Sequence, residues 1–513
     1  MNQPPPLINP SSRTSNIVRL KATDGTPVEF VEKEPMQGGM KDVYFSPDKS
    51  YVVAFFRQPQ DFNARDRLAN IVGVYRERIF NQPGGDYWKD LYCWPTHIVE
   101  HKGMLGIRAP TYAGHFFFKY GSQNNDMQLG IRGREKEGKW FSTGTHQQKY
   151  LDERERGSWI DYFLVCIRIA RGAKRLHAAG LAHSDLSYKN VLIDPTSGSA
   201  AIIDIDGLVV PGRYPPDVVG TPDFIAPEVM ATLRLPVGDK NRALPRIETD
   251  RHALAVLIYM YMLYRHPLKG GIVHPANNEE ERLNLEMGSK ALFVEHPTDT
   301  RNRPNLGDVK KSELPFADVT KLPYAITGPY LKELFDRAFI SGLHQPSLRP
   351  LADEWENALV RTVDLMQPCA NVRCGHKWYV VDNTTKPKCP FCATPFSGLL
   401  PVLNLYSKRG GDTFKPDNHR LMVYSNQYLY PWHANRLIFP NEKLNNEQKK
   451  PVGYFSFHNG KWIFINQRLT GLKDLTAKRP VPINSPLELT DAQQILLSPE
   501  EGGRLVQVQM IRG

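Results

Sequence analysis

The pattern of apolar and polar positions divides the chain into a mixed helical and stranded part and a later part built of short strands. Residues 159–178 carry apolar side chains at helical spacing, which predicts one long helix. Residues 253–264 form the longest near-continuous apolar run, which is too short to cross a bilayer and predicts the buried helix of a large lobe. After residue 400, alternating runs separated by Asn, Gly and Pro are typical of a β-sandwich.

Two short apolar runs between these helices are flanked by groups that suit phosphoryl transfer. Residues 191–193 and 201–203 are separated by Asp-Pro-Thr-Ser-Gly, which predicts a β-hairpin. Asp185 and Asn190 precede this hairpin and Asp204 follows it, so we expect the three side chains beside one cleft. Phosphoryl transfer requires one carboxylate to orient the attacking hydroxyl, and an amide oxygen plus a second carboxylate to hold magnesium.

The segments around these groups resemble the eukaryotic-type protein kinases. Residues 183–190, His-Ser-Asp-Leu-Ser-Tyr-Lys-Asn, are similar to the catalytic loop of that family, and residues 204–207, Asp-Ile-Asp-Gly, to its magnesium loop. Residues 220–228, Gly-Thr-Pro-Asp-Phe-Ile-Ala-Pro-Glu, are similar to the end of a kinase activation segment. The resemblance implies a bilobal α+β fold with ATP and Mg²⁺ as cofactors, Asp185 as the catalytic carboxylate, and Asn190 and Asp204 as magnesium ligands.

The resemblance also implies contacts that brace the catalytic loop. Asp250 occupies a position similar to the aspartate that supports this loop, and Glu228 is expected to pair with Arg349. Lys189 offers a cation near the transferred phosphoryl group. Ser184 replaces the arginine that receives an activating phosphate, and residues 207–220 contain prolines, so a weakly switched enzyme is expected. Thr221-Pro222 favours Ser or Thr as the acceptor.

The amino-terminal lobe lacks the usual strand lysine. Gly38 and Gly39 resemble the turn that approaches phosphate, but Phe55 or Phe56 falls where the family places its lysine. Two cations could replace it: Lys41, as in the with-no-lysine kinases, and Arg57 at the end of the next strand. Lys41 is favoured because it acts as a compact point charge, whereas an arginine fork demands more specific geometry.

Other parts of the predicted kinase region carry less specific signals. A helix over residues 66–80 offers Glu77 as the partner of the phosphate lysine, or as a solvated side chain. Asp206 replaces a family glycine, and it could face the metal, stiffen the turn or remain solvated. Strands over 94–99 and 105–110 lead to a hinge at 111–114. Residues 121–157 are polar and glycine-containing and predict a surface insertion.

Four of the six cysteines are clustered in the sequence. Cys369 and Cys374 form a C-x4-C pair, and Cys389 and Cys392 form a C-x2-C pair, as in small zinc ribbons. Four thiolates can close a tetrahedral site around Zn²⁺ and stabilise a short segment. Disulfides are the competing interpretation, and His376 is an alternative to Cys374 as a ligand.

Composition bounds the chain without deciding its function. A length of 513 residues predicts about two to four domains. The net charge of +11 is spread along the chain among acidic residues, so a solvated basic surface is favoured over a nucleic-acid site, which stays an alternative. Residues 1–15 are expected to form a flexible leader without a secretion signal, and a cytoplasmic protein without a membrane anchor is inferred.

The complete order of parts resembles the kinase component of bacterial phosphorylation triads associated with tellurite resistance. The expected parts are a kinase N-lobe at 16–114, a C-lobe at 115–365, a zinc ribbon at 366–398 and a β-sandwich at 399–513 that is similar to forkhead-associated domains. The resemblance implies stress signalling with a von Willebrand A-type protein and a metal-dependent phosphatase as partners. Two functions remain open: a Ser/Thr protein kinase, or a pseudokinase scaffold that assembles partner proteins.

Overall fold

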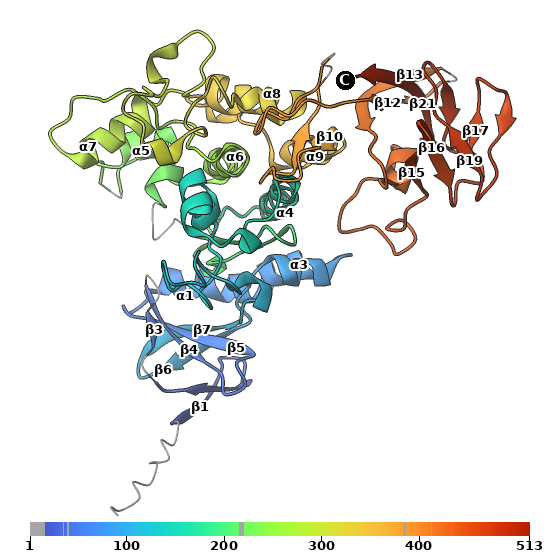
Figure 1. Cartoon of the computed structure of the whole chain (residues 1–513). Coiled ribbons are helices and arrows are strands. Elements are labelled where there is room, and N and C mark those ends of the chain that lie inside the picture. Colours follow the sequence, from blue (N-terminus) through green and yellow to red (C-terminus); the bar gives the residue numbers. More distant parts are fainter. Residues whose placement is uncertain are drawn as a thin grey trace, which may run out of the picture.

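The computed structural model describes residues 16–513 except 34, 38–39, 215–219, 237, 383–385 and 412. The expected leader and the two glycines Gly38 and Gly39 therefore lie outside the described residues. Figure 1 shows a small sheet-containing lobe at the bottom, a helical lobe above it, and a β-sandwich at the right. Within the described ranges, no helix combines the length and the apolar character that crossing a bilayer requires.

The amino-terminal lobe is built on a five-stranded antiparallel sheet of order β3-β4-β5-β7-β6. A hairpin of two further strands precedes this sheet. The seven strands are β1 (Ile17–Lys21), β2 (Pro27–Val31), β3 (Met36–Gln37), β4 (Lys41–Phe45), β5 (Tyr51–Phe56), β6 (His97–His101) and β7 (Met104–Pro110).

A nearly continuous helical segment follows β5 in the amino-terminal lobe. It consists of α1 (Phe62–Asn70), η1 (Ile71–Tyr75) and α2 (Arg76–Phe80), and the short helix α3 (Gly85–Leu91) comes after it. Leu68 and Ile71 are buried at helical spacing, which explains why the sequence pattern predicted a helix here. The predicted strands before the hinge are confirmed as β6 and β7.

The helical lobe is organised around two long helices. They are α4 (Trp159–Ala178), which coincides with the predicted helix, and α6 (Ile247–Leu263), most of whose side chains are buried. The predicted hairpin is β8 (Val191–Asp194) and β9 (Ser199–Ile202). The remaining helices of this lobe are α5 (Pro227–Thr232), α7 (Glu279–Asn284), α8 (Pro329–Asp336) and α9 (Ala352–Val363).

The structure corrects in part the expectation that residues 121–157 form a surface insertion: residues 127–130 and 132–134 are exposed, but the second half of the segment enters the core. Phe141 and Leu151 are fully buried in the main core. Lys136 makes buried ion pairs of 2.9 Å with both Glu155 and Asp194. A Cβ at Gly138 would meet the hydroxyl of Tyr261 at 1.9 Å, so this backbone packs directly on α6. Part of the polarity of the segment is therefore internal, because the ammonium of Lys136 enters the lobe together with two carboxylates that balance its charge.

A small knuckle and a β-sandwich complete the chain. The knuckle contains β10 (Met366–Pro368) and β11 (Trp378–Val380). The sandwich has a six-stranded sheet of order β13-β12-β21-β20-β17-β18 and a four-stranded sheet of order β14-β15-β16-β19. Its strands are β12 (Leu399–Lys408), β13 (Phe414–Met422), β14 (Tyr428–Leu429), β15 (Gly453–His458), β16 (Lys461–Asn466), β17 (Lys473–Asp474), β18 (Arg479–Pro480), β19 (Pro486–Glu488), β20 (Gln494–Leu496) and β21 (Arg504–Arg512), with α10 (Pro431–Ala434) between β14 and β15.

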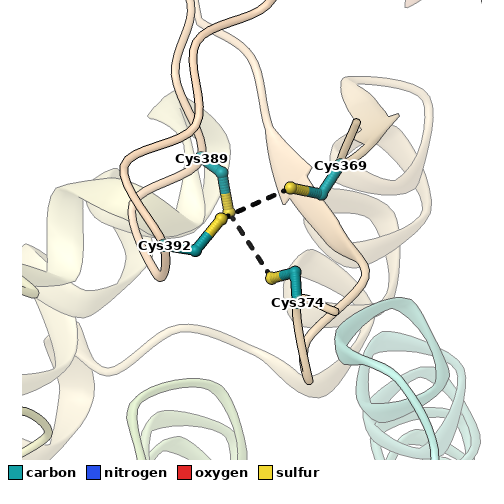
Figure 2. Close-up of side chains that lie close together, drawn as sticks. All are labelled: Cys369, Cys374, Cys389 and Cys392. Carbon is teal, nitrogen blue, oxygen red and sulfur yellow. Dashed lines mark hydrogen bonds between the residues drawn. The ribbon is translucent and has the colours of Figure 1, made fainter. Parts of the chain in front are cut away.

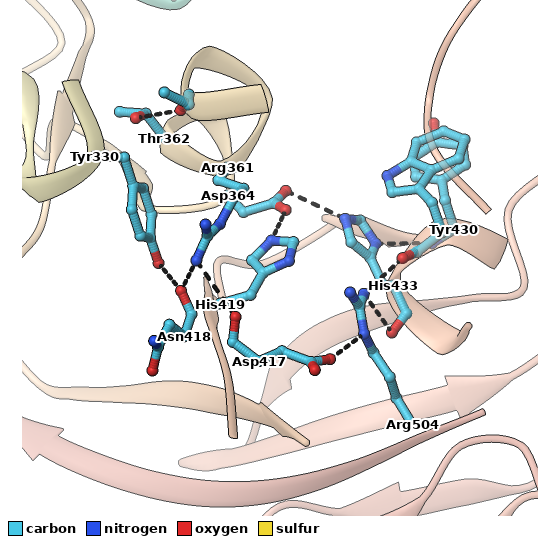
Figure 3. Close-up of polar contacts among 12 residues, drawn as sticks. Tyr330, Arg361, Thr362, Asp364, Asp417, Asn418, His419, Tyr430, His433 and Arg504 are labelled. Carbon is cyan, nitrogen blue, oxygen red and sulfur yellow. Dashed lines mark hydrogen bonds and ion pairs between the residues drawn. The ribbon is translucent and has the colours of Figure 1, made fainter. Parts of the chain in front are cut away.

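A buried polar cluster joins the sandwich to the end of α9 (Figure 3). The carboxylate of Asp364 lies 2.6 Å from Nε2 of His419 and 3.2 Å from Nε2 of His433. Burial by itself would raise the pKa of Asp364, but the two imidazoles hold that pKa well below its usual range. A second bridge comes from Arg171 of α4, which donates to the carbonyl of Pro440 at 2.7 Å. The sandwich is thus attached to the helical lobe by buried polar contacts from both the end of α9 and α4.

Candidate active site

The catalytic-loop segment is held by the aspartate that the sequence predicted. The backbone N–H groups of His183 and Ser184 donate to Asp250 at 2.6 and 3.0 Å. Asp250 is buried in the first turn of α6. Ser184 adopts a left-handed backbone with φ 67°, a strained conformation for a serine that these two hydrogen bonds stabilise. The predicted brace is confirmed.

Asp185 and Asn190 meet directly. The Nδ2 of Asn190 donates to the Asp185 carboxylate at 2.7 Å and to the Asp185 carbonyl at 2.8 Å. The other carboxylate oxygen of Asp185 accepts the N–H of Thr221 at 2.6 Å. Next to it, Gly220 has φ 112°, and a Cβ there would lie 3.2 Å from the carbonyl of Ser184. Both oxygens of Asp185 are therefore oriented by neighbours.

Lys41 forms a cluster with the two aspartates of the magnesium-loop segment. Its Nζ lies 2.5 Å from Asp206 and 3.3 Å from Asp204. Burial alone would lower the pKa of Lys41, but the attraction of Asp206 and Asp204 outweighs burial and raises it. Asp204 has φ 61°, and the adjacent Ile203 donates its N–H to the Asn190 carbonyl at 3.0 Å. This bond ties the aspartate cluster to the catalytic loop.

Sheet register explains how Lys41 reaches this cluster. Lys41 on β4 stands directly opposite Phe56 on β5, and its ammonium lies 5.2 Å from the centre of the Phe56 ring. Phe56 is one of the two residues that the sequence placed near the family lysine position. A side chain that starts on the neighbouring strand therefore brings its charge to the same region.

Three other predicted site residues lie outside this cluster. Arg57 pairs with Asp42 at 2.8 Å and donates to the Lys41 carbonyl, near the surface of the sheet. Glu77 is exposed on α2, and the structure does not bring it to Lys41. Lys189 is exposed beside the catalytic loop, with its backbone N–H donating to Ser187 Oγ at 3.3 Å.

The sequence analysis missed Arg67 on α1. Arg67 is 4% exposed. Burial lowers the pKa of Arg67, and the negative charges of two acidic groups, first Asp206 and then Asp61, oppose that lowering. Arg67 thus comes from the helix toward Asp206, while Lys41 comes to it from the sheet. Its spacing from Ala64, Leu68 and Ile71 places Arg67 on the buried face of the helix, and that signal could have identified it.

The end of the activation segment is fixed by charged pairs. Glu228 and Arg349 form the predicted pair through two hydrogen bonds of 2.9 and 2.7 Å, which is confirmed. Asp223 pairs with Lys269 at 2.6 Å, and its carbonyl lies 2.9 Å from Nε2 of His266. These contacts hold residues 220–228 against the helical lobe.

The four clustered cysteines converge in space (Figure 2). The sulfur atoms of Cys369, Cys374, Cys389 and Cys392 all lie within 4.8 Å of one another, and all four are free thiols. Free thiols at this spacing disfavour the disulfide interpretation. The His376 ring instead stacks on Phe391 at 3.8 Å, away from a ligand role. The knuckle packs on the start of α4, where the N–H of Trp159 donates to the His376 carbonyl at 2.9 Å.

Comparison with known proteins gives a family match over part of the chain. Residues 138–312 match the family described as Protein kinase domain. The serine/threonine-protein kinase PkaB of Streptomyces coelicolor is 30% identical over 143 residues, which are 26% of this chain and 31% of the relative. Calcium-dependent protein kinase 4 of Arabidopsis thaliana is 29% identical over 159 residues, 30% of this chain and 28% of the relative.

A third relative agrees with these two. A dual serine/threonine and tyrosine protein kinase of Apis mellifera is 31% identical over 152 residues, 28% of this chain and 14% of the relative. The chain spans less than a third of the length of each of these three relatives. The matched region contains the catalytic-loop segment, the aspartate pair at 204 and 206, and the brace at Asp250. Over residues 138–312 the chain is therefore similar to protein kinase domains, and the geometry of the catalytic-loop segment agrees with that similarity.

Proposed function

We propose that this protein is a serine/threonine protein kinase in which Lys41 takes the place of the strand lysine. The observation that carries the proposal is the pairing of Lys41 with both Asp204 and Asp206 at the catalytic loop. Thr221-Pro222 in the activation-segment motif supports Ser or Thr as the acceptor, and the name of the Streptomyces coelicolor relative agrees with that choice.

A protein kinase domain implies ATP and Mg²⁺, and the donor set fits both. Asp204 has a half-exposed carboxylate, at 50%. Among the described residues, no hydrogen bond reaches the side-chain oxygen of Asn190, whose Nδ2 is used by Asp185. Asn190 and Asp204 would hold Mg²⁺ through oxygen atoms, and Lys41 would contact phosphate. When bound, Mg-ATP supplies the phosphoryl group and the cation that neutralises its charge.

The chain's own contribution to transfer is orientation and proton acceptance. The carboxylate of Asp185 is held by Thr221 and Asn190, so it presents a defined edge to an incoming hydroxyl. Asp185 would accept the hydroxyl proton as the oxygen attacks, and Lys41 would stabilise the developing negative charge. Preoriented groups of this kind lower the barrier because they do not reorganise during the reaction.

The experiment that tests the proposal compares phosphoryl transfer from radiolabelled ATP by the wild type, by Asp185→Asn and by a surface control, Asp90→Asn. Asp90 is exposed, so its replacement should leave transfer unchanged. We expect Asp185→Asn to lose about 100-fold or more of the rate, since a positioned general base contributes that much. Equal transfer by wild type and Asp185→Asn would overturn the assignment.

A scaffold without catalysis is the second candidate function. The 2.5 Å contact between Lys41 and Asp206 favours it, because this contact occupies the cation that would otherwise meet phosphate. Calorimetric titration with Mg-ATP separates the two candidates. Saturable nucleotide binding that Lys41→Met weakens supports the kinase, whereas absence of binding together with absence of transfer supports the scaffold.

We further propose that the four-cysteine cluster is a structural zinc site. Four converging thiols fill every position of a tetrahedral site, so no ligand position is left for catalysis. Purified protein should carry one Zn²⁺ per chain by elemental analysis, and Cys389→Ser should lose it and lower the melting temperature. Cys93→Ala, which removes a thiol outside the cluster, should keep the metal. A metal content equal in both variants would contradict the zinc site.

The carboxy-terminal parts are proposed to recruit partner proteins. The triad resemblance supports a von Willebrand A-type protein and a metal-dependent phosphatase as partners in bacterial stress signalling. The β-sandwich offers two sheets of six and four strands, an arrangement that suits a forkhead-associated-like module. Affinity capture with residues 366–513 and with the full chain would test whether these partners bind.

A further inference from the structure

A cavity of about 530 Å³ lies on the amino-terminal lobe, away from the residues assigned to the active site. One wall is the helical segment of α1, η1 and α2, which contributes Gly73 and Arg76. The opposite wall is formed by His97 on β6 and Arg108 on β7, and the turn between β1 and β2 contributes Asp24 at the rim. The volume lies within the range of about 300–1,000 Å³ that ligand sites occupy.

The cavity gathers cations that have no carboxylate partner. Neither Arg76 nor Arg108 forms an ion pair with any residue of the described ranges, and the Nε atom of each is buried without a hydrogen bond. The Arg108 guanidinium instead lies 4.0 Å from the centre of the Tyr51 ring.

The pKa of His97 is affected by both arginines, which indicates that the two positive charges lie near the same imidazole ring. Burial is the main cause that lowers the pKa of His97, and the positive charges of Arg108 and Arg76 lower it further. Asp24 opposes them, with its carboxylate 3.6 Å from His97 Nε2, but its side chain is 58% exposed at the rim. The positive charge inside the cavity is therefore only partly balanced.

The wall of the cavity leaves room for a ligand. No heavy atom lies within 4 Å of the position that a Cβ would take at Gly73. The cavity presents two guanidinium groups and one imidazole. This set of groups matches a phosphate dianion, with its two charges and several acceptor oxygens, better than it matches a ligand with a single carboxylate. An anion held here would connect the helical segment to the sheet.

We propose that this cavity binds a phosphate monoester group through Arg76, Arg108 and His97. The helical segment that forms the cavity wall also carries Arg67, which approaches Asp206 in the active site. Binding of the ester would fix this segment against β6 and β7. It would thereby hold Arg67 in place beside Asp206, the aspartate that pairs with Lys41. This coupling to the active site rests on the proposed kinase function, whereas binding of the phosphate group does not.

The test is calorimetric titration of the full chain with three probes: inorganic phosphate, the peptide Ala-Ala-phosphothreonine-Ala-Ala, and its unphosphorylated form. We expect both phosphate probes to bind and the unphosphorylated peptide not to bind. Tighter binding of the phosphopeptide would identify a phosphorylated protein segment as the ligand, and equal binding of both phosphate probes would identify a small phosphate ester.

Four variants assign the binding to the cavity. Arg76→Gln and Arg108→Gln should each weaken binding by about tenfold or more, the loss expected for a charged hydrogen bond. Gly73→Leu should block binding without changing any charge. Arg78→Gln, an exposed arginine on the same helix, should bind as the wild type does.

The proposal would be overturned by no heat from either phosphate probe, or by unchanged affinity in both Arg76→Gln and Arg108→Gln while the variants melt like the wild type. The Lys41→Met variant separates this site from the proposed nucleotide site. It should retain full affinity for the phosphate probes even if phosphoryl transfer proves absent. Binding that Lys41→Met abolishes and Arg76→Gln spares would place the phosphate in the nucleotide site and refute the cavity.

Discussion

At the scale of single residues, a lysine and a phenylalanine face each other across two neighbouring strands beside the aspartate cluster. Lys41 and Phe56 stand opposite each other, and the ammonium of Lys41 extends over the Phe56 ring toward Asp206. In the proposed kinase, the charge near phosphate would be supplied from β4 instead of β5. Arg67 adds a second buried cation to the same aspartate from the helix side.

This arrangement predicts a loss and a rescue. Lys41→Met should reduce phosphoryl transfer by about 100-fold or more, the magnitude expected when one stabilising charge is removed. Adding Phe56→Lys to that variant should restore part of the activity, because a lysine on β5 starts directly opposite. Initial rates of peptide phosphorylation measure both effects. Arg57→Met is the matched control and should stay close to wild type, since Arg57 pairs with Asp42.

If the double variant is no more active than Lys41→Met, a lysine on β5 does not replace the lysine on β4. The strand that carries the lysine would then matter as well as the charge of its side chain. Loss of activity in Arg57→Met equal to that in Lys41→Met would instead support the alternative in which Arg57 contacts phosphate.

At the scale of elements, the segment that follows α6 connects the helical core to the activation-segment motif. His266 makes this connection through both ring nitrogens. Its Nδ1 accepts the N–H of Leu268 at 3.1 Å, and its Nε2 lies 2.9 Å from the carbonyl of Asp223. This pair of contacts requires the neutral ring with the proton on Nε2. Burial is the main cause that lowers the pKa of His266, to about 4, and Lys269 adds to it.

The low pKa predicts that acid destabilises this connection. An unfolded histidine has a pKa of about 6.5, so below that pH the unfolded chain binds the proton that the folded chain excludes. The free energy of unfolding should therefore fall as the pH drops from about 6.5 toward 4, by up to about 1.4 kcal/mol per pH unit from this group. Thermal unfolding from neutral to acidic pH measures it.

The control for this prediction is His266→Asn, which removes the titrating ring. The variant should be less stable at neutral pH because it loses a buried contact, but its stability should depend less steeply on pH in the same window. A slope identical to that of the wild type would show that other buried groups cause the acid sensitivity.

At the scale of the whole molecule, the β-sandwich is joined to the helical lobe through groups that are buried and charged (Figure 3). His433 accepts the N–H of Tyr430 through Nδ1 at 3.1 Å, so its Nε2 carries the proton that faces Asp364. Arg504 on β21 pairs with Asp417 at 2.9 Å and donates to the Trp432 carbonyl at 2.7 Å. The junction depends on residues from both sides.

Removing the central carboxylate should separate the parts. Asp364→Ala leaves the Nε2–H groups of two buried imidazoles without their acceptor, and each unsatisfied buried donor costs about 1–3 kcal/mol. We expect limited proteolysis to release the sandwich faster in this variant than in the wild type, with Asp90→Ala as the surface control. Equal cleavage rates would mean that the other contacts across the junction, among them those from Arg171 to Pro440 and from Tyr330 to the Asn418 carbonyl, hold the sandwich without Asp364.

Much of the kinase region could be predicted from sequence because its signals are local. The helix at 159–178, the hairpin after Asn190 and the convergence of the four cysteines depend on periodicity, turn residues and short spacings. The braces at Asp250 and between Glu228 and Arg349 followed from the order of motifs, although their partners are far apart in sequence.

Sequence alone determined which segments form helices and strands and which carry acidic, amide and thiol groups, because those properties follow from neighbouring residues. Only the tertiary structure decided that Lys41 meets Asp206, 165 residues away, that Arg67 and not Glu77 turns inward, and that Lys136 and Glu155 pair in the interior. Sheet register and helix rotation set these contacts. Sheet register and helix rotation depend on the packing of the whole chain, because a polar group is buried only where a residue from another part of the chain can pair with it.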